Sequence, residues 1–526
     1  MVVMVGPRAL AAARRVLPRV SSPSARTLTA SSPSGRPSPS ITRLASSSRL
    51  SQLSATQCLR SACRRGYSTG AQAASAATAP ETVTINGKTY ATDSWFNVPP
   101  NVLAHTSRKL HLQKDHPVAI TRQIIESVFD PAVFSRHNDF DPVVSTFDNF
   151  DSLEFPADHP GRRPSDTYYI NQTTLLRTHT SAHELALFRD GASPGKLISA
   201  DVYRRDEVDR SHYPVFHQME GMRVWDRPAG TTSSSSDSSS LAAAILADLA
   251  ALPSHDAPVE DPKPPFDAAT NPLQAAHHSP AEAAAVVAHL KRTLELMVLE
   301  LFRRADQARG LATDRAAPPQ MRWVEAYFPF TAPSWELEVL YNGDWLEVLG
   351  CGVTQQQILV NAARPGQVGW AFGLGLDRLA MLLFRIPDIR LFWSADPRFL
   401  GQFAGVSDDL ARLALFEPFS KYPACPRDVS FWLGEAATAA TAAGGQGEGQ
   451  GLHPNDVMEV IRSVAGDSAE DVKLVDEFTH PKTGRRAMAY RIVYRSLERT
   501  LTNEETNRMH AEVERVLVER FGVQIR

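Results

Sequence analysis

The sequence of 526 residues predicts an α+β protein with two folded parts. Short runs in which apolar and polar residues alternate, as in half-buried strands, recur through its middle, and Asn-Gly turns join some of them. A long apolar stripe at helical spacing follows at residues 280–311. In residues 428–526 the patterns follow the order strand, helix, strand, strand, helix and strand, which predicts a separate small sandwich of sheet and helices.

Residues 1–80 differ in composition from the rest of the chain. They contain 11 Arg residues among Ser and Ala, but no Asp, Glu or Lys. This composition predicts a mitochondrial transit peptide that begins with a basic amphipathic helix; a disordered nucleic-acid-binding arm is the alternative. Residues 65–68 (RGYS) resemble a mitochondrial processing site with cleavage after Tyr67.

The charge and the cysteine content limit which ligands and which cell compartment fit the chain beyond residue 80. Beyond residue 80, 44 basic residues face 58 acidic ones, a net charge of −14, so any nucleic acid would have to bind a local basic surface. Cys351 and Cys425 are too few for a disulfide framework or a metal site, which agrees with a reducing compartment such as the mitochondrial matrix. No apolar run reaches membrane-spanning length.

The first predicted elements lead to a possible anion site. They are a hairpin at residues 83–90, an amphipathic helix at 116–129 and a strand at 143–156. Residues 175–181 predict a further strand, followed by a helix from about Ala182 with Ser and Thr at its start. Such a helix start suits a carboxylate or phosphate, although His179 and His183 are also compatible with ordinary polar positions. Zinc is excluded because no third ligand is evident.

A hairpin with a charged turn is predicted at residues 197–222. Its first strand ends near Arg204, and its second places Phe216, Gln218 and Glu220 on one face. Arg suits phosphate oxygens because its planar fork donates two parallel hydrogen bonds. These side chains could together hold a nucleotide; a solvated charged hairpin is the alternative.

The next stretch contains an insertion and a long helix. Residues 227–266 are rich in Ser, Pro and acid, so we expect a disordered insertion looped out of the fold. Residues 280–311 predict the helix, and residues 323–330 predict a strand that ends in Phe328-Pro329-Phe330. Such an aromatic run most often fills a core.

A second hairpin, at residues 335–349, precedes a glycine-rich segment. Asn342-Gly343 predicts its turn, and Glu336, Glu338 and Glu347 are candidate magnesium ligands, Glu347 first, or else surface carboxylates. Residues 369–381 predict a Gly-rich turn into an apolar helix, and residues 387–417 predict connecting helices.

The C-terminal part predicts a ferredoxin-like βαββαβ sandwich. Its strands are expected at residues 428–433, 472–478 and 488–494 and its helices at 455–464 and 503–521, with a Gly/Ala-rich insertion up to residue 451. Local basic density beside Tyr490 and Tyr494 fits RNA, or else a solvated strand face. The basic residues are Lys482, Arg485, Arg486, Arg491, Arg495 and Arg499.

Residues 201–221 and 369–381 resemble motifs 2 and 3 of the class II aminoacyl-tRNA synthetases, and the run from Tyr203 to Glu220 resembles the phenylalanyl-tRNA synthetases. The resemblance implies a class II antiparallel sheet flanked by helices in residues 81–415, with an insertion near 227–266. It further implies an anticodon-binding domain in residues 416–526, with an insertion near 434–452. Both modules on one chain imply a monomeric organellar enzyme that attaches L-phenylalanine to tRNA(Phe) through a phenylalanyl-adenylate.

The resemblance also implies site residues. Catalytic roles fall to Arg204, His212 and Arg378, and magnesium to Glu347. ATP would be bound by Arg204, Ser211, His212, Tyr213, Phe216, Glu347 and Arg378. The residues implied for phenylalanine are His179, Ser181, Ala182, His183, Glu184, Gln218, Met219, Glu220, Phe328, Phe330, Ala371 and Phe372. The residues implied for tRNA are Lys482, Arg485, Arg486, Arg491 and Arg495.

One departure and two alternatives accompany this interpretation. The resembled family often has Gln at the position of Glu184. A synthetase paralogue without aminoacylation activity is disfavoured because both Arg204 and Arg378 are present. A purely RNA-binding protein would leave the Phe328-Pro329-Phe330 run and residues 369–381, which resemble motif 3, without a purpose.

Overall fold

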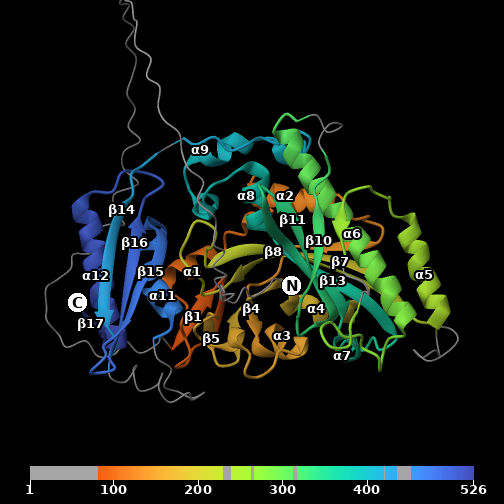
Figure 1. Ribbon diagram of the computed structural model, residues 1–526, viewed down its shortest axis with the longest axis horizontal. Coiled ribbons are helices and arrows are strands. Elements are labelled where there is room, and N and C mark those ends of the chain that lie inside the picture. Colours follow the sequence, from red (N-terminus) through yellow and green to blue (C-terminus); the bar gives the residue numbers. More distant parts are fainter. Residues whose placement is uncertain (1–80, 229–237, 262–265, 312–316, 420, 435–451) are drawn as a thin grey trace, which may run out of the picture. The chain divides into compact units, whose positions relative to one another are not determined.

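The computed structural model describes residues 81–228, 238–261, 266–311, 317–419, 421–434 and 452–526 (Figure 1). The predicted transit peptide and the Gly/Ala-rich insertion lie outside these residues. We call residues 81–417 the body and residues 421–526 the tail. Both parts combine helices with largely antiparallel sheets, so the predicted α+β class is confirmed. Within the described residues, no helix is both long and apolar enough to cross a membrane.

An eight-stranded sheet forms the centre of the body, in the order β3-β7-β8-β13-β12-β11-β10-β9. All neighbours from β7 to β10 are antiparallel, and the two edge strands pair in parallel. The strands are β3 (Phe134–His137), β7 (Gly195–Tyr203), β8 (Val215–Asp226), β9 (Val259–Glu260), β10 (Met321–Glu325), β11 (Thr331–Tyr341), β12 (Asp344–Thr354) and β13 (Gln367–Gly375).

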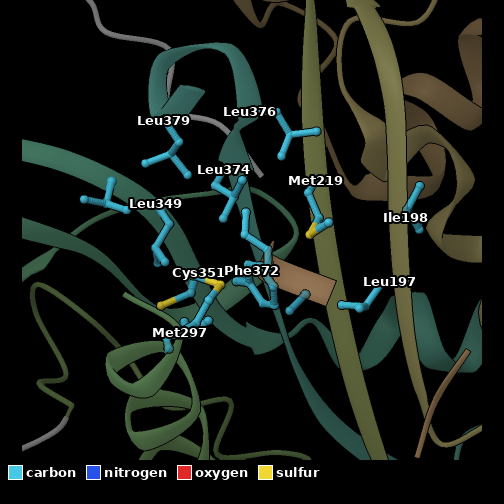
Figure 2. Packing of buried hydrophobic residues seen from close by; sticks show 14 of the residues in the cluster. Leu197, Ile198, Met219, Met297, Leu349, Cys351, Phe372, Leu374, Leu376 and Leu379 are labelled. Carbon is cyan, nitrogen blue, oxygen red and sulfur yellow. The ribbon is translucent and has the colours of Figure 1, made fainter. Parts of the chain in front are cut away.

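Helices bury one face of this sheet. Leu197, Met219 and Phe372 point from their strands into a core that also contains Met297 of the long helix (Figure 2). A capping box fixes the start of that helix, because Ser279 and Glu282 each accept a backbone N–H of the other. The body helices are α1 (Pro100–His105), α2 (Pro117–Glu126), α5 (Ser238–Ala251), α6 (Pro280–Ala308), α7 (Gln356–Asn361) and α8 (Leu376–Phe384), with the 3₁₀ turn η1 (Leu110–Leu112).

Short elements precede the sheet along the chain. The hairpin β1 (Thr82–Ile85) and β2 (Lys88–Ala91) confirms the first prediction. A small sheet follows in the order β4-β6-β5, with several helical turns. These elements are β4 (Val143–Ser145), α3 (Thr146–Asn149), η2 (Asp151–Leu153), η3 (Pro160–Arg162), β5 (Tyr169–Asn171), β6 (Thr174–Leu176), η4 (Thr180–His183) and α4 (Glu184–Asp190).

The strand predicted at residues 143–156 is wrong beyond Ser145. The Ser145 hydroxyl oxygen accepts the backbone N–H of Asp148 at 3.0 Å, so it caps α3 and turns the chain out of the strand. The strand predicted at residues 323–330 also ends early, at Glu325. Phe328 and Phe330 instead lie in a tight turn, which the backbone hydrogen bond from Thr331 to Phe328 closes at 3.3 Å.

Part of the predicted looped-out insertion is ordered by packing. Residues 238–251 form α5, whose Leu241, Ala242 and Ile245 are buried in the main core. Val259 and Glu260 form β9, which pairs with β10 at the edge of the sheet. The prediction of disorder from composition was wrong for these residues, because a few apolar residues at helical spacing are enough to bury one helix face. Residues 229–237 and 262–265 lie outside the described residues.

The hairpin between β11 and β12 forms as predicted. Asn342 and Gly343 have φ angles of 53° and 91°, the left-handed conformations that a two-residue hairpin turn requires. The connection after α8 contains only short helical turns, which are η5 (Ile389–Trp393), α9 (Pro397–Leu400), η6 (Gly401–Phe403) and η7 (Val406–Asp408).

The tail has the predicted order of strands and helices, and its sheet runs β15-β16-β14-β17. Val429 and Phe431 share a buried cluster with residues of both helices, so one sheet face is covered. The opposite face carries the alternate residues. The elements are β14 (Cys425–Trp432), α11 (Pro454–Ala465), η8 (Gly466–Ser468), β15 (Ala469–Thr479), β16 (Arg486–Tyr494), α12 (Asn503–Phe521) and β17 (Gln524–Ile525).

Candidate active site

The predicted site residues gather where β8 pairs with β13. Glu220 lies opposite Gly373, Gln218 opposite Gly375, and Ala371 opposite Met222. Because paired residues share a sheet face and successive residues alternate, Gln218, Glu220 and Ala371 lie on one face. The glycines keep this face open between the polar side chains.

Met219 and Phe372 lie on the other face. Both are buried in the main core (Figure 2), where the Phe372 ring stacks on Phe129 with centroids 5.7 Å apart. The implied role of these two residues in binding phenylalanine is therefore corrected, because period-two alternation directs them to the helices.

The 3₁₀ turn η4 covers the open face and holds Glu220. The hydroxyls of Thr180 and Ser181 donate to the carboxylate Oε2 of Glu220 at 3.0 and 2.7 Å. The backbone N–H of Thr180 donates to Oε1 of Gln218 at 3.2 Å. The two hydroxyl residues that were expected to cap the following helix thus hold the Glu220 carboxylate instead. Thr180 was not among the predicted site residues.

Two buried side chains of this face keep polar atoms without partners. Among the described residues, neither carboxylate oxygen of Glu184 has a hydrogen-bond partner, and the same holds for Nε2 of Gln218. Burial raises the pKa of Glu184 well above its usual range, and the neighbouring Glu220 raises it further. A buried polar atom without a partner is costly, so a ligand is expected to bind these groups.

An aromatic wall stands beside them. The Phe328 and Phe330 rings stack with centroids 6.1 Å apart, and Phe330 stacks on Phe155 at 5.8 Å. Phe155 in turn stacks on His179 at 5.5 Å. Burial lowers the pKa of His179 well below its usual range, so the imidazole is neutral. Phe155 was missed because it lies within the stretch, residues 143–156, that was wrongly expected to be a strand.

Two predicted substrate residues have structural contacts instead. Ala182 packs in a small cluster with Val144, Phe150, Tyr169 and Leu175. His183 stacks on Phe140 with centroids 4.1 Å apart and contacts Nη1 of Arg177 through Nε2 at 2.8 Å. We therefore correct their predicted role from binding phenylalanine to supporting η4.

Arg204 lies immediately after β7 and faces Phe216. Its Nε donates to the carbonyl of Thr178 at 2.7 Å, and its guanidinium carbon is 5.4 Å from the Phe216 ring centroid. Burial lowers the pKa of Arg204 to about 10, so the side chain stays charged at neutral pH. Its two terminal nitrogens donate no hydrogen bond to any described residue, which leaves the planar fork for a ligand.

Arg378 acts electrostatically on both Glu347 and His212. Burial raises the pKa of Glu347 to about 7, with Glu336 adding to the shift and Arg378 opposing it. His212 contacts Asp209 through Nδ1 at 2.8 Å; this hydrogen bond raises the pKa of His212, and Arg378 again opposes the rise. The clustered carboxylates fit a hard cation such as Mg²⁺, which takes oxygen ligands and would relieve their repulsion.

A buried pair joins β8 to the start of α8, the helix that follows β13. The carboxylate Oδ2 of Asp377 accepts the backbone N–H of His217 at 2.6 Å and lies 3.1 Å from Nδ1 of the same residue. Asp377 precedes Arg378, and His217 precedes Gln218. This pair therefore ties the position of the exposed arginine to that of the buried amide, and the sequence gave no signal for it.

Two predicted ATP ligands have other partners. Ser211 is exposed and donates to Asp209 at 2.9 Å. Tyr213 stacks on Trp393 with centroids 5.4 Å apart, and its hydroxyl donates to Asp467 of the tail at 2.7 Å. The predicted role of Tyr213 is corrected accordingly, whereas Ser211 keeps a place in the turn beside His212.

The tail displays an aromatic and basic cluster that contains the predicted Arg485 together with aromatic residues that the sequence did not reveal. Trp432 packs edge-on against Phe478 at 6.1 Å, and the guanidinium carbons of Arg485 and Arg526 lie 5.1 and 5.5 Å from its ring. His480 lies 6.3 Å from the same ring. Phe478 is 39% exposed, so this surface can offer aromatic faces to a ligand.

The predicted tail residues differ in their availability. Tyr490 and Tyr494 are completely buried, so the prediction that they stack on bases is wrong. Arg495 contacts the buried Glu470 at 3.1 Å, which corrects its predicted role in tRNA binding. Arg486 pairs with Glu477, and Arg491 makes two 2.8 Å hydrogen bonds to Asp428. Lys482 is exposed in the loop before β16.

Comparison with known protein families agrees with both parts of the fold. Residues 101–229 and 286–403 match the family described as "tRNA synthetases class II core domain (F)". Residues 420–526 match the family described as "Ferredoxin-fold anticodon binding domain".

Comparison with individual proteins identifies the family. The chain is 46% identical to the mitochondrial phenylalanine–tRNA ligase of Saccharomyces cerevisiae over 84% of this chain and 95% of the relative. It is 40% identical to the probable mitochondrial phenylalanine–tRNA ligase of Drosophila melanogaster, over 90% and 97% respectively. For the mouse mitochondrial enzyme the identity is 39%, over 84% and 88%. With a class II core, an anticodon-binding tail and these relatives over most of its length, the chain belongs to the mitochondrial phenylalanine–tRNA ligases.

Proposed function

We propose that the protein attaches L-phenylalanine to tRNA(Phe) in two steps, with ATP consumed in the first. The observation that carries this proposal is the juxtaposition of an aromatic wall with unpartnered buried polar groups on one sheet face. Phe328, Phe330 and Phe155 supply the wall, and Gln218 and Glu184 supply the polar groups. An amino acid with an aromatic side chain satisfies both.

The amino acid would bind with its ring against the aromatic wall and its ammonium group at Glu220. Aromatic rings attract one another in edge-to-face and offset geometries, which favours a phenyl side chain in this slot. Glu220 is held in place by Thr180 and Ser181, so it is organised before the substrate arrives. Ala371, a small side chain on the same sheet face, would bound the slot.

In the first step a carboxylate oxygen of phenylalanine attacks the α-phosphorus of ATP, and pyrophosphate leaves. Arg204 would donate its free fork to the α-phosphate while Phe216 supports the adenine ring. Arg378 and His212 would neutralise the departing phosphates. Mg²⁺ bound at Glu347 would supply additional charge neutralisation. Such a step depends on positioning and on stabilising charge rather than on a protein base.

In the second step a ribose hydroxyl at the end of the tRNA takes the phenylalanyl group, and AMP leaves. The tail would hold the anticodon end of the same tRNA. Trp432 and Phe478 are suited to stack on unpaired bases, while Arg485, Arg526 and Lys482 are suited to contact phosphates. Arg486 and Arg491 would join them only after releasing their acidic partners.

The proposal extends to the setting of the enzyme. We propose that it works as a monomer in the mitochondrial matrix, in line with the mitochondrial relatives. Residues 1–80 would be the transit peptide, residues 81–415 the catalytic domain and residues 416–526 the anticodon-binding domain. Removing an Arg-rich leader would leave the mature chain acidic, so its RNA contacts must be local.

The test is amino-acid-dependent exchange between ATP and pyrophosphate, run with each of the twenty amino acids. We expect exchange with phenylalanine far above all others, and a loss of roughly a hundredfold or more in Arg204→Ala if one transition-state donor is removed. Arg364→Ala is a matched control. It also removes a guanidinium group, but one that donates to the carbonyl of Arg189 at 3.0 Å. RNA binding without any exchange would instead support the purely RNA-binding alternative.

A further inference from the structure

Glu184 is a buried acid whose side chain has no hydrogen-bond partner in the part of the chain that the structure describes. It is 1% exposed, and neither of its oxygens has a hydrogen-bond partner among the described residues. The nearby Glu220 differs, because two hydroxyl groups donate to it. One acid of the pair is thus satisfied by the fold, and the other is not.

The charges around Glu184 explain the form in which it is buried. Glu220, on β8, is a like charge that disfavours a second carboxylate. His179 and His183, on the preceding segment, are both kept neutral by burial and supply no compensating cation. Gln218, on β8, offers only a neutral amide. In the empty site Glu184 therefore retains its proton, since an isolated buried carboxylate would be far more costly.

An ammonium group changes this balance. A substrate amine that is held by Glu220 brings a positive charge into the same buried space, where attraction between opposite charges is stronger than in water. This charge cancels the repulsion that kept Glu184 protonated. The carboxylate oxygens of Glu184 then accept hydrogen bonds from the ammonium group.

We propose that Glu184 is a second carboxylate ligand of the substrate's ammonium group and that phenylalanine binding releases the Glu184 proton to solvent. The inference rests on the proposed function, because it takes the amino acid to bind at Glu220. Only the O–H bond of Glu184 breaks; the proton passes to water, and the ammonium keeps its three hydrogens. The Glu184, Glu220 and ammonium group then carries one net negative charge both before and after binding.

A dependence of affinity on pH follows. While Glu184 of the empty site is protonated, each unit of rising pH strengthens phenylalanine binding by up to about tenfold, because one proton is exchanged for one ligand. Glu184→Gln has a side chain of the same shape that holds no titratable proton. The affinity of this variant for phenylalanine should be nearly independent of pH, and at alkaline pH it should be weaker than that of the wild type.

The decisive measurement is calorimetric titration of the full chain with phenylalanine, in buffers of different ionisation enthalpy. The dependence of the heat on the buffer counts the protons released. We expect about one proton per phenylalanine for the wild type below the pKa of Glu184, and about none for Glu184→Gln. A ligand control needs no variant: 3-phenylpropionate has the same ring and carboxylate without the ammonium and should release no proton.

The outcomes separate this inference from the proposed function. Wild-type protein that binds phenylalanine without releasing a proton, or a Glu184→Gln variant that releases as many as wild type, would overturn the role of Glu184 and leave the function intact. Equal proton release with 3-phenylpropionate would likewise refute a response to the ammonium. If phenylalanine produced no binding heat and supported no exchange, both the function and the inference would fall.

Discussion

The pair of Asp377 and His217 offers a sharp test of how β8 is coupled to the start of α8. Asp377 is 2% exposed, and its carboxylate accepts the backbone N–H of His217 at 2.6 Å. Asp377→Ala would leave this buried N–H unsatisfied, at a cost of about 2 kcal/mol. Asp377→Asn keeps an oxygen acceptor but loses the charge, which should cost about 1 kcal/mol.

Asp377→Ala should also lower activity, because Arg378 follows Asp377 in the chain, Gln218 follows His217, and both would lose their fixed positions. If the lost 2 kcal/mol appears in the transition state, kcat/KM for exchange falls about thirtyfold in Asp377→Ala. The decrease should be similar when ATP or phenylalanine is varied, because one link positions both side chains. Asp377→Asn should lie between this variant and wild type.

Steady-state exchange kinetics and urea unfolding, on the same preparations, check this expectation. Glu282→Gln is the stability control, since Glu282 pairs with Arg227 at 3.1 Å at the start of α6 and contacts neither Asp377 nor His217. It should lose comparable stability and keep its kcat/KM. An Asp377→Ala variant that is destabilised but fully active would refute the coupling, as would a defect confined to ATP.

Three further results are expected. Ala371→Gly should admit para-chlorophenylalanine in the exchange assay, because it removes the only side-chain atom beyond the backbone at that point of the slot; unchanged kinetics would contradict this. Trp432→Ala should raise the KM for tRNA by roughly tenfold or more through a lost stacking partner, while amino-acid activation stays normal; a defect in activation would indicate misfolding instead. The pKa of Glu347 is raised to about 7 by burial and by Glu336, so its proton competes with the metal below that pH; the Mg²⁺ concentration for half-maximal exchange should fall as pH rises through about 7, and Glu347→Gln should abolish this dependence.

The sequence predicted the elements that have strong local signals. The two-residue turn at Asn342-Gly343 and the apolar stripe of residues 280–311 identify their hairpin and helix without any tertiary information. The hairpin with Arg204 and Phe216 formed as predicted, and so did the order of the tail elements. In each case the local pattern and the final packing favour the same structure.

Long-range contacts account for the errors. Phe155, Thr180 and the link between Asp377 and His217 acquire their places from segments distant in the sequence, which no local pattern reveals. Tyr490 and Tyr494 were expected to be exposed because Arg residues surround them in sequence. Alternation along β16 instead turns both rings into the tail core and the intervening Arg491 outward.

The division of β13 between two environments has a practical consequence for changing substrate choice. Residues 371 and 372 are adjacent in the chain, but Ala371 shares a sheet face with Gln218 and Glu220, whereas Phe372 stacks on Phe129. Substitution at Ala371 can therefore alter that face without disturbing the packing of Phe372. Gly369 lies on the same face as Ala371 but has to stay glycine, because an added Cβ would lie 2.2 Å from the carbonyl oxygen of Arg223.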